Sequence, residues 1–553
     1  MSDDSQPMKA QRLYVGLAVL AALLATALHF GPALLRADIF EDDAAHHIFW
    51  LYRYSDPALF PGDLSVDALR INAPLGYRAV YATAAQLMDV AFAAKLLGVA
   101  LLLLSFWLTW KVATAIGGAD RELRGLLGVA SLSAIIAYAP AADLMGVMAL
   151  QRTFALPLTL LCLWALIAKR YAWVGGAWLA GGLFYPVVLP TLGVAAGCVF
   201  LRDMARERRM PEQWVLNGVL GLAAIGLALF GMPKAGDLGP AYTFTQAMTM
   251  PEWGPGGRID LYFGKGSFFS WAWNQNMGLA WSVGSLLAFT SAVVVAWLTG
   301  QRRLVPLAAW TMLAVGLAWW LALRLFPDEL MFFLYVPNRH ARWVVGVFGT
   351  VALVAAGYGV LQVVVRRQTP QLRELLSRWF AVAAAVGSCA LLLPHALQSE
   401  RAPVDKDLEQ TYAFLASLPK TTLIAAHPDL ADYIPLRARR SVLASSETSM
   451  PWLKTYFETV KPRVEASLRA AYAPSMEAMD RELAPYGVDV FVTGPDIWQK
   501  TGYFQPYDSM VQDLLARGRT HGFALQHPPE ERILFRSGEY YVIRTLRNPA
   551  GSR

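Results

Sequence analysis

Cysteine and charge are both scarce in this chain. Only 3 of 553 residues are cysteine, and Cys162, Cys198 and Cys389 all fall inside apolar stretches, which excludes a disulfide framework in the exposed parts. Charged residues make up 16% of the sequence, too few for one soluble domain of this length. The C-terminal part has no glycine-rich phosphate loop, nucleophile elbow or zinc-finger spacing, so nothing there indicates those nucleotide-binding, hydrolase or zinc-finger classes.

Apolar residues are abundant instead. They form 56% of the sequence, and they gather in stretches of about 17–25 residues, the length that crosses a hydrocarbon core. The sequence therefore predicts a polytopic α-helical membrane protein with about eleven transmembrane helices. The predicted spans are residues 13–36, 91–115, 125–140, 154–168, 171–184, 186–201, 213–232, 278–300, 303–326, 343–365 and 379–397.

Basic residues predict the orientation, because lysine and arginine in short loops stay on the cytoplasmic side. Lys9 and Arg12 place the N-terminus inside, and an odd number of spans then places the C-terminus outside. The first stretch is long, lacks a small-residue cleavage site and precedes further spans, so we predict an uncleaved membrane anchor. Later basic clusters alternate to the same inner side, near residues 111–124, 169–170, 202–209, 302–303 and 366–367.

The apolar run 171–201 has basic clusters at both ends. Two short helices meeting near Tyr185-Pro186 would return the chain to the same side, whereas a single tilted span would invert everything after it. The net charge of +7 lies largely in the cytoplasmic loops, where anionic membrane lipids attract it, and nucleic acid is not implied.

The C-terminal residues 399–553, called the tail below, follow a different pattern from the transmembrane part, residues 1–398. Apolar β-rich runs alternate with amphipathic ones, which predicts a small α/β domain outside the cytoplasm. A scaffold or substrate-orienting role is favoured over catalysis. The predicted helices are 405–418 and others across 454–485, and the predicted strands are 421–426, 441–444, 488–493 and 540–545.

The outer loop 37–90 carries three consecutive acids, Glu41, Asp42 and Asp43, followed by His46 and His47. Asp42 or Asp43 can cap a helix that begins at Ala44, and helical spacing then pairs Asp43 with His47 and Asp42 with His46. The next residues, Ile48 to Tyr54, would hold this helix at the membrane interface with aromatic rings at head-group depth. A solvated helix cap is the alternative. Carboxylate and imidazole suit manganese or zinc, but the spacing fixes no coordination geometry, so no metal site is predicted.

Arginines are unexpected on the outer side, given the inner bias of basic residues. Arg339 and Arg342, with His340 between them, stand at the entrance of a span and could hold a phosphate bidentately. Snorkelling of long basic side chains to the interface is the alternative, and it is slightly favoured for Arg152. The other outer arginines that we predict to bind substrate are Arg53, Arg78, Arg152 and Arg258.

One span followed by an acidic outer loop, many further spans and an outer C-terminal domain resemble the GT-C glycosyltransferases. These include the catalytic subunits of oligosaccharyltransferases and the mannosyl and arabinosyl transferases that use polyprenyl-phosphate sugars. The run Asp42-Asp43-Ala-Ala-His46-His47-Ile-Phe-Trp50, with the later segments 56–63 and 74–78, is also similar to a group of bacterial membrane proteins placed near that superfamily.

The resemblance implies inverting transfer of a sugar from a polyprenyl-phosphate donor to a glycan, lipid or protein acceptor on the outer face. By position, Asp42 or Asp43 matches the family's acidic residue and would act as the general base, while Arg339 and Arg342 would bind the lipid phosphate. The tail lacks the tryptophan-tryptophan-aspartate signature of oligosaccharyltransferases, which argues against peptide glycosylation. The second acidic outer segment offers only Asp237, Glu252 and Asp260.

Two other classes stay open. A transporter or assembly factor for an envelope polysaccharide would carry ionisable or helix-breaking residues deep in its spans, and such residues are few here. A polymerase or ligase of lipid-linked glycans is an enzyme of a different kind on the same outer face.

Overall fold

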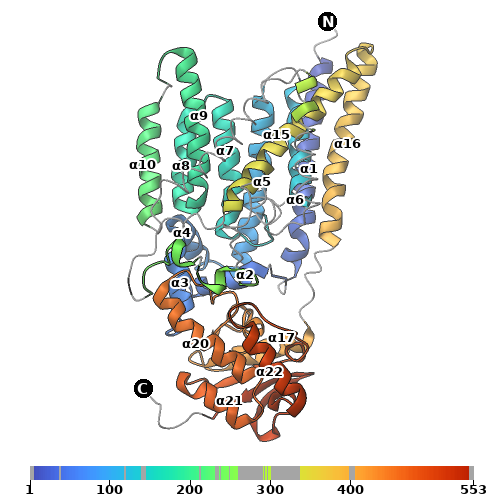
Figure 1. Cartoon of the computed structure of the whole chain (residues 1–553). Coiled ribbons are helices and arrows are strands. Elements are labelled where there is room, and N and C mark those ends of the chain that lie inside the picture. The colour runs from blue at the N-terminus through green and yellow to red at the C-terminus, as the bar shows by residue number, and fades with distance from the viewer. Residues whose placement is uncertain are drawn as a thin grey trace.

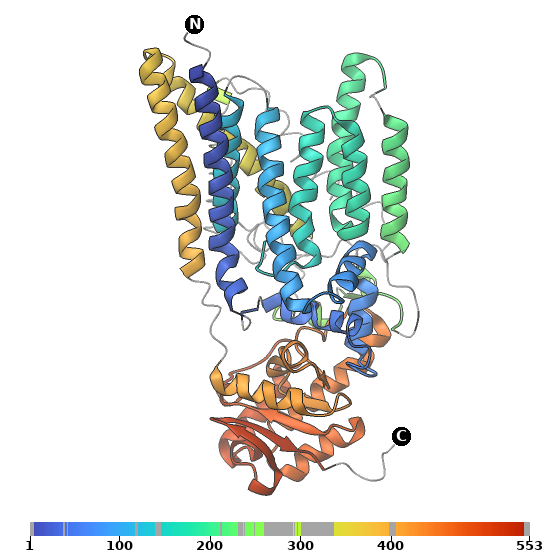
Figure 2. The same cartoon turned by 180° about the vertical axis from the view of Figure 1, so that it is seen from behind.

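A bundle of long helices and a compact α/β unit make up the chain in the computed structural model, with the N-terminus at the bundle end far from the tail (Figure 1). A set of short helices lies between the two parts, and the view from behind shows the same order (Figure 2). The structure describes residues 5–36, 39–40, 42–116, 120–138, 145–210, 213–230, 236, 238–247, 249–258, 291, 293–295, 297–299, 337–397 and 405–546.

Four described helices are long and apolar enough to cross a membrane, namely Ala10–Leu35, Val90–Ala115, Pro186–Glu207 and Pro370–Leu393. Shorter apolar helices accompany them, and the predicted span 303–326 lies outside the described residues, so the count of about eleven stays a prediction. The bundle helices are α1 (Ser5–Leu35), α5 (Val90–Ala115), α6 (Arg121–Tyr138), α7 (Ala155–Ile167), α8 (Tyr171–Phe184), α9 (Leu189–Glu207), α10 (Trp214–Phe230), α15 (Pro337–Val365) and α16 (Pro370–Leu397).

Large apolar side chains cover the outside of this bundle. Leu23 on α1 is 52% exposed, Leu222 on α10 is 72% exposed and Trp379 on α16 is 65% exposed. Contiguous apolar surface of this kind is unfavourable in water and suits contact with lipid. The exposed leucines therefore agree with the membrane location predicted from composition.

The run 171–201 forms two antiparallel helices. α8 ends at Phe184, a short 3₁₀ turn covers Pro186–Val188, and α9 leads back. The Tyr171 hydroxyl donates to Asp203 at 2.6 Å, and the Lys169 ammonium pairs with Glu207 at 2.8 Å, so the two basic ends lie together. The hairpin interpretation is confirmed, and the single tilted span is wrong.

The first outer loop folds into four short helices: α2 (Asp42–His47), the 3₁₀ helix η1 (Phe49–Tyr54), α3 (Leu64–Asn72) and α4 (Leu75–Ala84). α2 begins at Asp42 rather than Ala44, so Asp42 and Asp43 occupy its first turn. A carboxylate in the first turn of a helix is favoured by the positive end of the helix dipole.

The apolar residues after α2 are buried within the protein rather than presented on its surface. Ile48, Phe49, Trp50 and Leu51 are each at most 2% exposed and belong to the main hydrophobic core. Phe49 packs edge-on against Phe60, with ring centroids 5.3 Å apart. Burial in the protein removes their apolar area from water.

The tail contains a five-stranded mixed sheet in the order β2-β1-β3-β5-β4. β1 runs parallel to β2 and β3, while β5 is antiparallel to β3 and β4. The predicted strands are all present, and β4 was not predicted because its sequence, Ile-Leu-Phe-Arg-Ser, does not alternate between apolar and polar residues. The strands are β1 (Leu423–Ala426), β2 (Ser441–Val442), β3 (Val490–Thr493), β4 (Ile533–Ser537) and β5 (Tyr540–Arg544).

Helices cover both faces of this sheet. Phe491 and Ile543 pack with Leu468 on one face, while Val492 and Val542 pack on the other. This alternation follows from the two-residue period of a strand. The helices are α17 (Lys406–Ser417), α18 (Pro428–Ala431), α19 (Ile434–Ala438), α20 (Lys454–Ala471), α21 (Met476–Leu483) and α22 (Asp508–His521).

Backbone hydrogen bonds join the tail to residues 238–258, which belong to the predicted second outer segment, roughly 233–277. The Lys454 amide donates to the Pro240 carbonyl at 2.8 Å, and the Gln505 amide donates to the Gly256 carbonyl at 2.8 Å. An ion pair joins the tail to the first outer loop, with 2.8 Å between the Arg439 guanidinium and the Asp89 carboxylate. The tail is therefore held in one position against the outer segments.

Candidate active site

The Asp43 carboxylate forms an ion pair with the Arg152 guanidinium. Asp43 lies in the first turn of α2, and Arg152 lies in the 3₁₀ turn η3 (Gln151–Phe154) that leads into α7. The Asp43 side chain is 39% exposed, while that of Arg152 is 14% exposed. A largely buried cation thus orients a carboxylate that a substrate can still reach.

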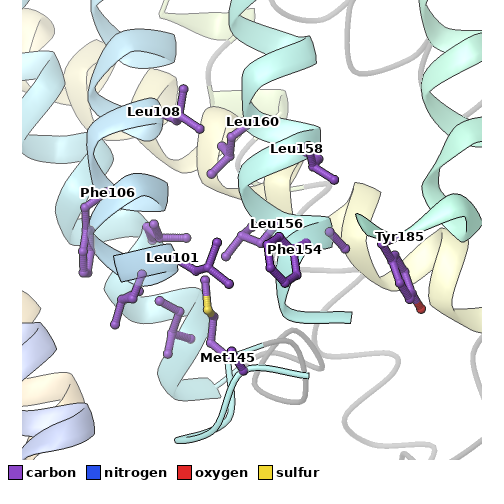
Figure 3. Close-up of a cluster of buried hydrophobic side chains, with 14 of the residues drawn as sticks. Leu101, Phe106, Leu108, Met145, Phe154, Leu156, Leu158, Leu160 and Tyr185 are labelled. Atoms are coloured by element: carbon purple, nitrogen blue, oxygen red, sulfur yellow. The ribbon is translucent and has the colours of Figure 1, made fainter. Parts of the chain in front are cut away.

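The turn that carries Arg152 is anchored in the hydrophobic core. Figure 3 shows Phe154, Leu156 and Leu160 of this turn and α7 projecting among the side chains around Leu101. The Phe154 ring stacks on Phe184 with centroids 4.6 Å apart. Close packing of this kind fixes the backbone beneath Arg152, and with it the direction of the ion pair.

His46 connects α2 to the tail. Its imidazole is 4% exposed and meets the Tyr433 ring edge-on, with centroids 5.5 Å apart. His47, by contrast, has an exposed side chain, and its carbonyl accepts a hydrogen bond of 2.9 Å from the Trp50 indole. Of the two histidines, His46 is the one that faces the tail.

Asp432 is a candidate site residue that sequence reasoning missed. It is 9% exposed, and its carboxylate accepts the Glu447 amide at 2.9 Å. Burial raises the pKa of Asp432 to about 7, with His46 opposing the rise and Asp429 adding to it. A carboxyl group that titrates near neutrality is well suited to proton transfer.

A local signal for Asp432 does exist. The acids Asp429 and Asp432 follow directly after β1, and loops at the carboxyl ends of parallel strands commonly form binding sites. The sequence alone could have indicated the loop, but nothing in it places that loop against α2.

Arg258 closes the network from the second outer segment by pairing with the Glu447 carboxylate. The positive charge of Arg258 also acts to lower the pKa of Asp432. Four segments that are distant in sequence therefore meet at the tail end of the bundle. They are α2 with Asp43 and His46, η3 with Arg152, the second outer segment with Arg258, and the tail with Asp432 and Glu447.

A buried polar cluster supports the loop that carries Asp432. The Asp429 carboxylate accepts a hydrogen bond from the Tyr503 hydroxyl at 3.0 Å and pairs with Lys500. The Asp429 amide donates to Nδ1 of His427 at 3.3 Å. Burial lowers the pKa of His427 to about 4, with Asp429 opposing the shift and Lys500 adding to it. His427 is therefore a neutral imidazole at physiological pH.

The remaining predicted residues are more scattered. Arg53 lies 4.0 Å from Asp67. Arg78, on α4, has no carboxylate within ion-pair distance in the described part of the chain, and its Nε atom is buried without a hydrogen bond. Glu41, Asp237 and Asp260 lie outside the described residues, as does the side chain of Asp42.

Arg339, His340 and Arg342 lie in the first two turns of α15, and their side chains are outside the described part. The far half of this helix is fixed at the N-terminal end of the bundle, because the Tyr358 hydroxyl donates to Asp120 at 3.1 Å. The first turns of α15 therefore point toward the tail end, where the network lies.

No group of three or more His, Cys, Asp or Glu side chains is placed to hold a metal ion among the residues that the structure describes. Within those residues, carboxylates of the network form ion pairs with arginines instead.

Comparison with known proteins finds no matching family model and no matching curated protein. Solved structures do match. The apo crystal structure of the Archaeoglobus fulgidus oligosaccharyltransferase is 11% identical, with a TM-score of 0.43, over 88% of this chain and 70% of that one. A complex of that enzyme with zinc and sulfate gives 11% identity and a TM-score of 0.36, over 87% of this chain and 68% of that one.

A third solved structure is archaeal oligosaccharyltransferase AglB from Archaeoglobus fulgidus, in complex with an inhibitory peptide and a dolichol-phosphate. It is 10% identical, with a TM-score of 0.38, over 87% of this chain and 69% of that one. These structures are of a GT-C enzyme, the superfamily that the sequence resembles. A likeness at this level carries no argument about the reaction, so function is argued below from the residues of this chain.

Proposed function

We propose that this chain transfers a sugar from a polyprenyl-phosphate donor to an envelope acceptor on the outer face of a bacterial inner membrane. The observation that carries the proposal is the convergence of the Asp43–Arg152 pair, Asp432 and Arg258 at the membrane end of the tail. Such a site combines a reachable carboxylate with cations beside the bilayer, where the head of a lipid-linked donor would lie.

In this mechanism Asp43 is the general base. Its carboxylate takes the proton of the acceptor hydroxyl while the hydroxyl oxygen attacks the anomeric carbon, and the bond from that carbon to the phosphate oxygen breaks. The electron pair leaves with the polyprenyl phosphate, and the configuration inverts. Glu41, Asp42 and His47 flank Asp43 in sequence and are its proposed partners.

Arginines stabilise the departing phosphate. A guanidinium presents planar donors that match phosphate oxygens in pairs. Arg339 and Arg342, with His340, are proposed to bind the phosphate from the first turns of α15. Arg152 and Arg258 are proposed to extend the same positive lining, while Arg53 and Arg78 remain predictions from the sequence.

Asp432 serves as a positioning residue rather than the base, because its side chain is nearly buried. The Asp432 carboxyl titrates near neutrality, and its protonation therefore determines how much negative charge His46 faces. The access of Asp43 to solvent, 39% against 9% for the Asp432 residue, is what separates the two roles.

The transporter alternative has little support in the described bundle. Lys95 is buried near the start of α5, and its ammonium donates to the Arg36 carbonyl at 2.9 Å, at the end of α1. This lysine caps a helix end at the bundle edge and does not mark a midplane pathway.

The proposal is tested by turnover of the purified chain with a panel of polyprenyl-phosphate monosaccharides. Asp43→Asn should reduce turnover by a factor on the order of 10²–10⁴ while donor binding is kept. Asp513→Asn, on the exposed face of α22, is the matched control and should retain full turnover. Normal turnover in Asp43→Asn would remove Asp43 as the base and favour a non-enzymatic envelope protein.

A further inference from the structure

A cavity of about 410 Å³ lies between the first outer loop and the tail, and none of the residues of the Asp43 network lines it. The loop contributes Pro61–Asp63, and the tail contributes the beginnings of β1 and β2 and the turn before β3. This volume falls within the roughly 300–1,000 Å³ of small-molecule sites. The polar side chains that line it are Asp63, Thr421, Ser441, Arg463, Tyr486 and Asp489.

Several of these polar groups lack protein partners. The Ser441 side chain belongs to a residue that is 6% exposed, and its hydroxyl has no hydrogen bond in the described structure. The Oδ2 atom of Asp63 is likewise buried without a hydrogen bond. A buried polar atom without a hydrogen bond is costly, so a small side-chain movement that brought either oxygen to a ligand in the cavity would be favourable.

Asp63 is held in a fixed direction. Its Oδ1 atom caps α3 by accepting the Ser65 amide at 2.9 Å and the Ser65 hydroxyl at 2.6 Å, which leaves Oδ2 for the cavity. Burial raises the pKa of Asp63, and the Ser65 bonds oppose that shift. The Ser441 hydroxyl is near enough to lower the same pKa, although the two oxygens do not meet hydrogen-bond geometry.

Arg463 supplies the positive charge of the cavity. It lies on α20, is partly buried, and forms no ion pair within the described residues. Asp489 also lines the cavity, and one of its oxygens accepts the Leu423 amide at 2.9 Å. Two carboxylates beside one guanidinium disfavour an anionic ligand, and the mostly polar lining disfavours a lipid chain.

We propose that this cavity binds a neutral mono- or disaccharide unit of the glycan on which the chain acts. Hydroxyl groups of a sugar can donate to the carboxylates and accept from the Arg463 guanidinium and the Ser441 hydroxyl. The Tyr486 ring offers an apolar face to the sugar ring. The choice of a glycan rests on the proposed function, and the site would make the tail a substrate-orienting module.

Binding is measured with the full chain in lipid nanodiscs free of glycoside detergents. The probes are methyl glycosides of mannose, glucose, galactose and N-acetylglucosamine, observed by saturation-transfer NMR. At least one probe should bind the wild-type chain, and Arg463→Gln and Asp63→Asn should each weaken it about tenfold. Asn caps a helix about as well as Asp, so Asp63→Asn keeps α3 intact.

Arg517→Gln, on the exposed side of α22, is the matched control and should bind as the wild type. No binding of any probe to the wild type would overturn the proposal, as would equal binding by both cavity variants. Displacement of the sugar by inorganic phosphate would assign the cavity to anions and also overturn it. Asp43→Asn should bind the probe normally, so loss of transfer and loss of sugar binding are separate outcomes.

Discussion

Asp432 and His427 have opposite effects on the pH dependence of tail stability. The Asp432 carboxyl has a pKa of about 7 in the folded chain and about 3.9 when unfolded. Between those values the folded form keeps a proton that the unfolded form has released, so stability falls as pH rises. His427 has a pKa of about 4 when folded and about 6.5 when unfolded. Between those values the unfolded chain binds the proton, so stability rises with pH.

The two pKa shifts make opposite contributions of similar size to the free energy of unfolding. Between about pH 5 and about pH 8, ionisation of Asp432 should remove about 3 kcal/mol from the free energy of unfolding. Over the same range, the unfolded chain loses the proton that it carries on His427, and this should add about 2 kcal/mol to the free energy of unfolding. The wild-type tail should therefore lose only about 1 kcal/mol in this range.

Single substitutions separate the two effects. Asp432→Asn removes the contribution that falls with pH and leaves that of His427. The free energy of unfolding of this variant should therefore rise by about 2 kcal/mol from about pH 5 to about pH 8. In His427→Gln it should fall by about 3 kcal/mol over the same range. The matched control is Asp513→Asn, which should follow the wild-type profile because Asp513 is exposed on α22.

The assay is hydrogen-exchange mass spectrometry of the full chain, which reports opening of the core strand Val490–Thr493. Rates are corrected for the intrinsic pH dependence of exchange. If Asp432→Asn kept the wild-type pH profile, Asp432 would not titrate near neutrality, and its proposed role beside His46 would fail.

Two further predictions concern topology and phosphate binding. A reporter fused after position 400 should be active only outside the cytoplasm and one near position 120 only inside, and a cytoplasmic tail would contradict the outer-face mechanism. Arg339→Ala and Arg342→Ala should weaken donor-lipid binding, measured by lipid co-purification, and the Lys variants should recover it only partly because an ammonium lacks the planar fork. Full recovery by lysine at both positions would favour snorkelling.

Local patterns in the sequence predicted the elements well. Pro186 indicated the break between α8 and α9, and the β-branched run around Val490 indicated a central strand. Basic clusters at both ends of the run 171–201 indicated a pair of helices that turns back, and the Tyr171–Asp203 bond shows that the two ends lie together. These patterns involve residues that are close in sequence, so they can be recognised without knowledge of the fold.

Long-range packing set the limits of prediction. Phe49 and Trp50 have the composition of an interfacial anchor, yet they are buried, because neighbouring loop residues such as Phe60 cover them. Asp43 and Arg152 are far apart in sequence, and no periodicity links them. Asp432 is a candidate because the fold places the tail beside α2. Its pKa is raised by burial in the folded chain.

The central claim is that a polyprenyl phosphate binds at the tail end of the bundle, and a structure of the chain with that lipid tests it most directly. We expect the phosphate between the first turns of α15 and the Asp43–Arg152 pair, with the prenyl chain along the bundle. A phosphate bound at the opposite end, beside the start of α6, would contradict the account.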